Sequence, residues 1–154
     1  MRLTTKSRYG TRMVLDIAIN ASNKPVTVGE ISRRQNISVK YLEKLIRTLK
    51  QGGIIVSHRG PHGGHMLAKP AEEITIGSLV RLLEDTTAIT DCAETDTKIC
   101  GECNLAGECI SQWVWIEASK AMFERLDGIT IASLIKKFDD ARIFNETHQS
   151  LFSS

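Results

Sequence analysis

The stretch that decides the fold is residues 27–51, TVGEISRRQNISVKYLEKLIRTLKQ. Its first part predicts a short helix over 28–35, because Thr27 followed three residues later by Glu30 forms a capping box. A tight turn then leads into a second amphipathic helix over 39–51. Two short helices joined by such a turn form a helix-turn-helix, so the sequence predicts this DNA-binding motif.

The second helix, capped by Ser38, has one apolar and one charged face. Its apolar stripe consists of Leu42, Leu45, Ile46 and Leu49. The opposite face is expected to expose Lys40, Tyr41, Glu43, Lys44, Arg47 and Lys50. Lys and Arg bind phosphates or guanine edges, and a Glu carboxylate accepts a hydrogen bond from the cytosine amino group. Because surface helices are often rich in Lys and Glu for solvation alone, the DNA-binding interpretation needs support from the neighbouring sequence.

A β-hairpin wing directly after this motif supplies that support. Strands are expected over 54–58 and 65–68, joined by the glycine-rich tip RGPHGG at 59–64. Arg59 at the tip is well placed to enter a minor groove, and we expect His62 to lie near phosphates. Metal binding by the three hairpin histidines is the alternative, but a hairpin tip gives poor ligand geometry.

The charge is distributed very unevenly along the chain. Residues 1–70 carry 13 Lys and Arg against 3 Asp and Glu, whereas residues 71–154 carry 7 against 15. The overall net charge of +2 hides this contrast. Because the basic half contains the helix-turn-helix and the wing, we interpret its charge as a footprint for DNA phosphates.

Other classes of function find little support in the sequence. We find no nucleophile–base pairing, no phosphate-binding loop and no paired carboxylates, so we expect neither an enzyme nor a small-molecule substrate. No apolar run approaches a membrane span, and no secretion signal follows the basic N-terminus, so we expect a cytoplasmic protein without membrane contact. A carrier or scaffold for iron–sulfur clusters that does not bind DNA is the remaining alternative. Such a protein would not need the basic half with its helix-turn-helix and wing.

Four further helices are expected, over residues 5–20, 76–84, 111–126 and 129–138. The helix over 111–126 is apolar on two sides, and a helix of this kind is buried on two sides. One side is expected to pack on its own domain and the other on a partner subunit, which predicts a dimerisation helix. The alternative is a core helix of a monomer.

The fold class is therefore mainly α with a small β-hairpin wing, and we divide the chain into four regions. We expect a winged helix-turn-helix DNA-binding domain over 1–85 and a cysteine-rich cluster-binding loop over 86–110. The dimerisation helix and a short C-terminal helix occupy 111–138, and a flexible tail occupies 139–154.

All four cysteines lie in one polar stretch, DCAETDTKICGECNLAGECI at 91–110. In the cytosol, where thiols stay reduced, such clustering favours a metal or an iron–sulfur cluster over structural disulfides. Four thiolates from Cys92, Cys100, Cys103 and Cys109 suit a 2Fe–2S or a 4Fe–4S cluster. A four-cysteine zinc site and a thiol–disulfide switch between Cys100 and Cys103 are the alternatives.

With these residues in view, the chain resembles the bacterial winged helix-turn-helix regulators of the IscR, NsrR and CymR type, and most of all the iron–sulfur cluster-binding members. The motifs that carry the resemblance are Met1-Arg2-Leu3-Thr4 with Tyr9, Ile37-Ser38, Tyr41-Leu42-Glu43, Arg59-Gly60-Pro61 with Gly63-Gly64, and the cysteine loop before Trp115. They extend to about residue 138. The resemblance implies a homodimer with swapped or crossed long helices on a palindromic operator in double-stranded DNA, and a repressor that senses redox or cluster status.

The resemblance also implies roles for individual residues. Bases are read through the positions occupied by Ser38, Lys40, Tyr41 and Glu43, and through the wing arginine, Arg59. Thr4 and Lys6, in the first turn of the first helix, lie near phosphates. Lys44, Arg47 and His62 complete the DNA-binding residues that we expect from the charged helix face and the wing.

The chain departs from the resemblance at the fourth cluster ligand. Where the IscR-like members place a histidine, this chain has Gln112, and where the NO-sensing branch places an acid, it has Arg8. The simplest account is a 2Fe–2S cluster held by all four cysteines of one chain. A nitric-oxide-sensing repressor with a 4Fe–4S cluster and a zinc- or thiol-based regulator remain the alternatives. If only three cysteines bind, Cys100 or Cys103 is the dispensable one.

Overall fold

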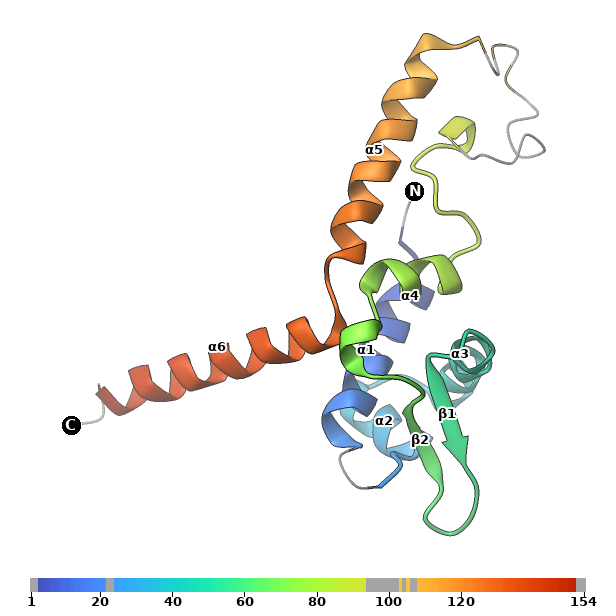
Figure 1. Cartoon of the computed structure of the whole chain (residues 1–154). Helices are drawn as coiled ribbons and strands as arrows, with labels where there is room; N and C mark the ends of the chain where they lie inside the picture. Colours follow the sequence, from blue (N-terminus) through green and yellow to red (C-terminus); the bar gives the residue numbers. More distant parts are fainter. Residues whose placement is uncertain (1–2, 22–23, 94–102, 104, 106–107, 152–154) are drawn as a thin grey trace.

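The computed structural model describes residues 3–21, 24–93, 103, 105 and 108–151. The protein is mainly helical with one two-stranded antiparallel hairpin, which confirms the expected fold class. Figure 1 shows the helices of the N-terminal half gathered into one body, from which two long helices project in different directions. In chain order the elements are α1 (Thr5–Asn20), α2 (Val28–Gln35), α3 (Val39–Gln51), β1 (Ile55–His58), β2 (Gly64–Leu67), the 3₁₀ turn η1 (Ala71–Glu73), α4 (Ile76–Leu83), the 3₁₀ turn η2 (Asp91–Ala93), α5 (Ile110–Asp127) and α6 (Ile131–Leu151).

Local capping sets the helix-turn-helix. The Thr27 hydroxyl accepts from the Glu30 backbone N–H at 3.2 Å, and the Glu30 carboxylate accepts from the Thr27 N–H at 2.8 Å, so the predicted capping box is present. Asn36 ends α2 in the left-handed conformation, with φ 53°, which turns the chain sharply. The Ser38 hydroxyl then accepts from the Tyr41 N–H and starts α3. The bounds predicted for both helices are confirmed.

The four helices α1, α2, α3 and α4 share one hydrophobic core with the base of the wing. Each fully buried aliphatic side chain stabilises such a core by about 1.5–3 kcal/mol relative to an exposed one. The largest fully buried side chains are Met13, Ile17, Ile31, Leu42, Leu49, Ile74, Leu79 and Ile131. Because Ile131 belongs to α6, the start of this helix is anchored in the same core.

The wing is fastened to the helix-turn-helix by its returning strand. The Val26 N–H donates to the His65 carbonyl at 3.0 Å, and the His65 N–H donates back to the Val26 carbonyl at 2.8 Å. Gly64 permits this close approach, because a Cβ there would stand 2.6 Å from the Val26 carbonyl oxygen. At the tip, Gly60 adopts φ +112°, a conformation that side-chain-bearing residues rarely take. The predicted wing is confirmed, with strand ends shifted by one residue.

The last helix is longer than the sequence analysis predicts. Its expected end at Phe138 is wrong, because α6 continues to Leu151 through most of the region expected to be a flexible tail. The polar composition suggested an end, but no Gly or Pro follows Gly128 in the sequence, so nothing breaks the helix. None of the described helices is both long and apolar enough to cross a membrane.

Candidate DNA-binding surface and cysteine segment

The charged face of α3 is open to solvent. Its exposed side chains are Lys40, Glu43, Lys44, Arg47 and Lys50. The buried stripe on the opposite side holds α3 against α1, α2 and α4, so the exposed side chains project from a fixed support. The Ser38 hydroxyl lies at the start of this face, but it is engaged in capping the helix.

Tyr41 is less exposed than the sequence analysis predicts. Its ring is half-buried and packs edge-on against Tyr9, with centroids 5.7 Å apart. Its hydroxyl forms a hydrogen bond with the Thr5 hydroxyl at 2.9 Å, and the Arg12 guanidinium lies over the other ring, 5.6 Å from the centroid of Tyr9. The predicted exposure is only partial because this aromatic ring packs on Tyr9 and Thr5 of α1.

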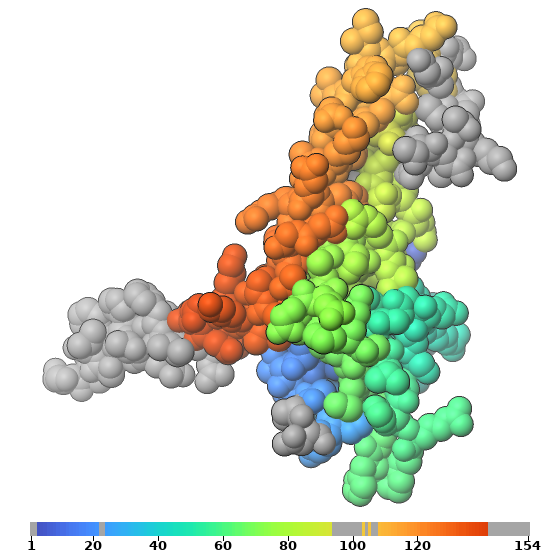
Figure 2. Space-filling model, in the orientation of Figure 1, coloured from blue at the N-terminus to red at the C-terminus, as the bar shows by residue number. Residues whose placement is uncertain are grey.

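The wing and α3 enclose one groove, lined by Val28, Glu43, Ile46, Arg47 and His65. Arg59 and His62 are exposed at the tip of the wing, which extends beyond the body of the molecule in Figure 2. His65 is half-buried, and this burial, together with the nearby Lys50, lowers the pKa of its imidazole. The structure therefore brings Glu43 and Arg47 next to the wing, while Arg59 and His62 lie at its far end.

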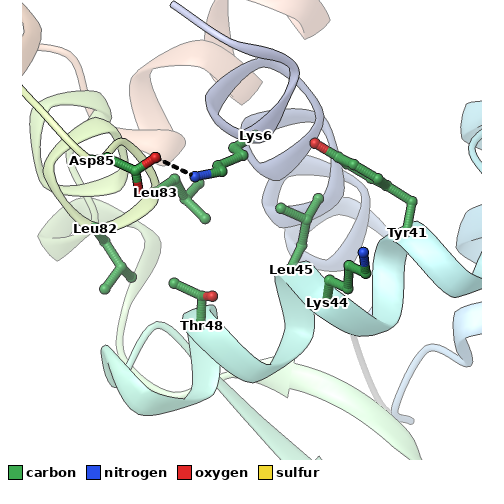
Figure 3. Close-up of a pocket in the computed structure, with 8 residues that line it drawn as sticks. All are labelled: Lys6, Tyr41, Lys44, Leu45, Thr48, Leu82, Leu83 and Asp85. Atoms are coloured by element: carbon green, nitrogen blue, oxygen red, sulfur yellow. Dashed lines mark hydrogen bonds and ion pairs between the residues drawn. The ribbon is translucent and has the colours of Figure 1, made fainter.

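Thr4 and Lys6 are held by Glu84 and Asp85 at the end of α4, and Figure 3 shows the contact between Lys6 and Asp85. The Thr4 N–H and hydroxyl both donate to Glu84 Oε1, at 2.9 and 3.1 Å, and Lys6 Nζ lies 2.8 Å from Asp85 Oδ2. Burial disfavours the charged form of Glu84, but the hydrogen bonds from the start of α1 outweigh it and lower the pKa of the carboxyl. The hydrogen bond to Asp85 raises the pKa of Lys6. The sequence analysis missed both acids, which are 80 and 79 positions from their partners.

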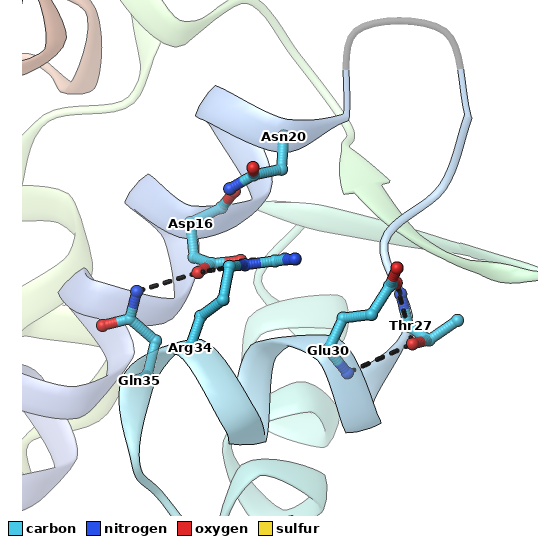
Figure 4. A network of polar contacts seen from close by, with 6 residues as sticks. All are labelled: Asp16, Asn20, Thr27, Glu30, Arg34 and Gln35. Atoms are coloured by element: carbon cyan, nitrogen blue, oxygen red, sulfur yellow. Dashed lines mark hydrogen bonds and ion pairs between the residues drawn. The ribbon is translucent and has the colours of Figure 1, made fainter.

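A second polar network, also missed, joins α1 to α2 (Figure 4). Asp16 is only 3% exposed, and its carboxylate accepts from Arg34 Nη2 at 2.6 Å, from Arg34 Nε at 3.0 Å and from the Gln35 amide at 2.8 Å. Arg12 in turn donates to the Gln35 side-chain oxygen at 3.1 Å and to its backbone carbonyl. Two features of the sequence could have predicted this network. One is the single acidic residue, Asp16, among the apolar residues of the first helix, and the other is the pair Arg34-Gln35 at the end of the second helix.

The described cysteines, Cys92, Cys103 and Cys109, are free thiols, and Cys100 lies outside the described residues. Cys92 belongs to η2, which packs on α5, and Cys109 is the N-cap of α5. The Gln112 amide donates to the Cys92 backbone carbonyl at 2.6 Å and so ties the two segments together. No group of three metal-binding side chains forms within the part of the chain that the structure describes.

The Cys109 thiol has an environment that favours the thiolate. Its sulfur lies 3.0 Å from the Ser111 hydroxyl, and this hydrogen bond, with the backbone N–H groups of Gln112 and Ser111, lowers the pKa of the thiol. The thiolate is the form that binds metals and reacts with oxidants. The donor chemistry at this end of α5 therefore fits a thiolate-held metal or cluster.

The first half of α5 carries exposed apolar side chains. Ile110 is 86% and Trp113 is 67% exposed, and Val114 and Trp115 are exposed as well. Further along the helix, Phe123 is buried, with the Arg81 guanidinium over its ring at 4.4 Å. Thus one end of α5 packs on its own domain, and the other presents an apolar surface of the kind that marks an interaction site.

Comparison with known proteins adds a family to this geometry. Residues 3–137 match the Rrf2 family, described as iron-dependent transcriptional regulators. The protein rrf2 of Nitratidesulfovibrio vulgaris is 48% identical over 136 residues, which cover 88% of each chain. Among solved structures, T. potens IscR superposes with a TM-score of 0.73 at 30% identity, over 92% of this chain and 90% of that one.

The fold is also similar to that of CymR, the global cysteine regulator of B. subtilis. That structure has a TM-score of 0.73 at 28% identity and covers 89% of this chain and 98% of its own. The likeness extends over the winged helix and the C-terminal helices together, and it confirms the resemblance drawn from the sequence motifs.

Proposed function

The chain belongs to the Rrf2 family of transcriptional regulators, and from this premise we propose that it acts as a homodimer on a palindromic operator in cytoplasmic DNA. Its family and relatives are regulators rather than enzymes. The observation that carries the proposal is the open, basic face of α3 directly beside the wing. A helix with such a face enters the major groove, while a hairpin arginine reaches the minor groove.

In this proposal each subunit reads one half-site. Lys40, Lys44 and Arg47 contact phosphates or guanine edges, and Glu43 accepts from a cytosine amino group. Arg59 and His62 contact DNA from the wing. The apolar first half of α5 pairs with its counterpart in the second subunit, so that two α3 helices lie about one helical turn, ~34 Å, apart.

For the sensing part we propose a 2Fe–2S cluster held by Cys92, Cys100, Cys103 and Cys109. The thiolate-favouring environment of Cys109 supports this, as does the similarity to T. potens IscR. Gln112 is a positioning residue in this arrangement, because its amide N–H holds the Cys92 backbone carbonyl. When bound, the cluster supplies the redox-sensitive state, and the chain contributes thiolates and the packing of η2 on α5.

A thiol-based regulator is the second candidate, favoured by the same lowered pKa of Cys109 and by the similarity to CymR. An oxidant reacts with the thiolate rather than the thiol, so Cys109 would be its first target. A 4Fe–4S cluster that responds to nitric oxide and a four-cysteine zinc site remain further possibilities for the same residues.

Anaerobic purification separates these candidates. We expect a coloured protein with about two iron and two sulfide ions per chain and an EPR signal after reduction. About four iron and four sulfide ions would indicate the 4Fe–4S cluster, and a colourless protein with one zinc per chain would contradict the cluster proposal. Single Cys→Ala variants at the four positions then identify the ligands, and Asp139→Ala, on the exposed surface of α6, serves as the control that leaves all four thiols and their hydrogen bonds in place.

The DNA-reading part is tested through Glu43. In a binding-site selection, Glu43→Ala should accept a broader set of sequences. The wild-type carboxylate is repelled by the DNA phosphates, and only a hydrogen bond from a cytosine amino group offsets this repulsion. Lys120→Ala on α5 is a surface control and should retain the wild-type preference. An unchanged preference in Glu43→Ala would show that this side chain does not read bases.

A further inference from the structure

The acidic pair at the end of α4, Glu84 and Asp85, is occupied by Thr4 and Lys6, the two groups that the family resemblance places near DNA phosphates. We propose that Asp85 is an intramolecular competitor for the Lys6 ammonium and thereby sets the affinity of the regulator for DNA. The inference rests on the proposed DNA-binding function and adds a residue outside the helix-turn-helix and the wing. Its basis is the 2.8 Å contact between Lys6 Nζ and Asp85 Oδ2.

Glu84 and Asp85 differ in how they hold the start of α1. Glu84 is partly buried and accepts both donors of Thr4, so it anchors the first turn of α1 against α4. The Asp85 side chain is 90% exposed, and its hydrogen bond comes from Lys6. The Glu84 anchor keeps Lys6 within reach of Asp85, so this exposed ion pair re-forms whenever it opens.

A DNA phosphate that approaches Lys6 meets the Asp85 carboxylate as well. The ammonium carries three donors but only one positive charge, so it cannot neutralise both anions. Two negative groups a few ångströms apart repel each other, and the phosphate must either displace Asp85 or accept a weaker contact. In both cases the carboxylate reduces the gain in binding free energy from Lys6.

Lys6 also lies close to the recognition helix. It lines a cavity of about 300 Å³ together with Tyr41, Lys44 and Leu45 of α3 and with Leu82 and Asp85 from the α4 end (Figure 3). The ion pair is therefore at the edge of the DNA-binding surface, where Lys44 contributes a second positive charge. A change of charge at Asp85 therefore alters the electrostatic potential at the same phosphates that α3 is proposed to approach.

The position of Asp85 in the chain links it to the cysteine segment. Glu84 is the C-cap of α4, and Asp85 is the first residue beyond it, on the way to Cys92 in η2. Asp85 therefore lies on the path of the chain between the core of the winged helix and the cysteine segment. Drawing Asp85 away from Lys6 frees the ammonium for phosphate, and this supplies a route by which the segment changes DNA affinity.

A double-mutant cycle on the full chain tests the competition. Binding is measured by fluorescence anisotropy with a labelled mixed-sequence duplex of about 30 base pairs, because phosphate contacts are independent of sequence. The proteins are wild type, Asp85→Asn, Lys6→Gln and the double variant, each titrated at several salt concentrations. Glu72→Gln, which removes an exposed acid from η1, measures the effect of net charge alone.

Asp85→Asn should bind about two- to five-fold more tightly than wild type at low salt, the range expected for releasing one exposed ion pair. Lys6→Gln should weaken binding and lower the salt slope by about 0.9, which corresponds to one phosphate contact. In the Lys6→Gln background, Asp85→Asn should raise the affinity for DNA by no more than Glu72→Gln raises it in the wild-type background.

Two outcomes would overturn the inference. In the first, Asp85→Asn raises the affinity for DNA no more than Glu72→Gln does. In the second, Asp85→Asn raises the affinity equally with and without Lys6, which would mean that Asp85 acts only through the net charge of the protein. A Lys6→Gln variant that binds like wild type would instead remove Lys6 from the phosphate contacts and the inference with it. Failure of the wild-type protein to bind any duplex at low salt, including those recovered in a binding-site selection, would overturn the proposed function itself.

Discussion

In helices α1 to α4 most of the large apolar side chains are buried in one core, whereas in the first half of α5 Ile110, Trp113, Val114 and Trp115 are exposed. The N-terminal half also contains a buried carboxylate, Asp16, which is paired with Arg34 and Gln35. At the start of α5, Ile110 and Trp113 are 86% and 67% exposed.

This difference separates a part that folds on its own contacts from a part that needs another surface. The winged helix packs most of its apolar side chains into its own core, and this core supports the DNA-binding face of α3. The first half of α5 leaves apolar area to be covered, and it adjoins the cysteine segment. The residues proposed to read one half-site therefore lie within one chain, whereas we expect sensing and assembly to involve the first half of α5 and the cysteine segment beside it.

The largest effect should come from the polar anchor of the N-terminal half. Asp16→Asn leaves Arg34 without its carboxylate partner, and removing one partner of a buried pair is strongly destabilising; because Arg34 is partly solvated, we expect a loss of about 2–4 kcal/mol. Urea unfolding at a fixed protein concentration measures it. The control Asp139→Asn, on the exposed surface of α6, should change the unfolding free energy by less than about 0.5 kcal/mol.

The second effect should appear only in assembly. Trp113→Ser removes a large exposed aromatic side chain from α5, and such residues are often hot spots worth about 2 kcal/mol, which corresponds to about 30-fold in dimer dissociation. Sedimentation over a range of concentrations measures this constant. Glu124→Gln, exposed in the second half of the same helix, is the control, and a Trp113→Ser dimer as tight as wild type would place the interface elsewhere.

A smaller effect is expected at the wing tip. Arg59→Ala should weaken binding to duplex DNA about three- to ten-fold and reduce the salt slope by about 1, because one guanidinium–phosphate or minor-groove contact is lost. Anisotropy titrations at several salt concentrations give both values. Arg125→Ala, an exposed arginine on α5, should retain wild-type binding; equal losses in the two variants would indicate a general charge effect.

The smallest effect should be the pH dependence contributed by His65. Its pKa is lowered by burial in the native state, so the unfolded chain binds the proton more readily as pH falls through the ordinary histidine pKa of about 6.5. Wild type should therefore lose stability between about pH 7.5 and 5.5 more steeply than His65→Gln does. Unfolding at both pH values tests this, with His62→Gln at the wing tip expected to follow wild type. Parallel curves for wild type and His65→Gln would show that burial of His65 is not linked to stability.

The accuracy of the sequence predictions follows the range of the interactions involved. The bounds of α2 and α3 were predicted because caps such as Thr27 with Glu30 act within one turn. The wing was predicted because its strands pair across a short glycine-rich tip. The end of α6 was mispredicted because polar composition does not stop a helix that lacks a breaking residue.

The candidate site divides in the same manner. The exposed charged face of α3 follows from its helical periodicity, whereas the partners of Thr4, Lys6 and Tyr41 come from elements that lie far away in the chain. The cysteine ligands and the dimer remain predictions, and Cys100 is outside the described residues.

The sequence by itself determined the winged helix-turn-helix, its basic character and the clustering of the cysteines, because these depend on local patterns of capping, periodicity and composition. Only the tertiary structure decided which charged side chains form ion pairs within the chain. Folding brings α4 onto α1 and places Asp85 against Lys6 across 79 positions of sequence. No local pattern encodes that contact, because it arises from packing the apolar faces of two separate helices.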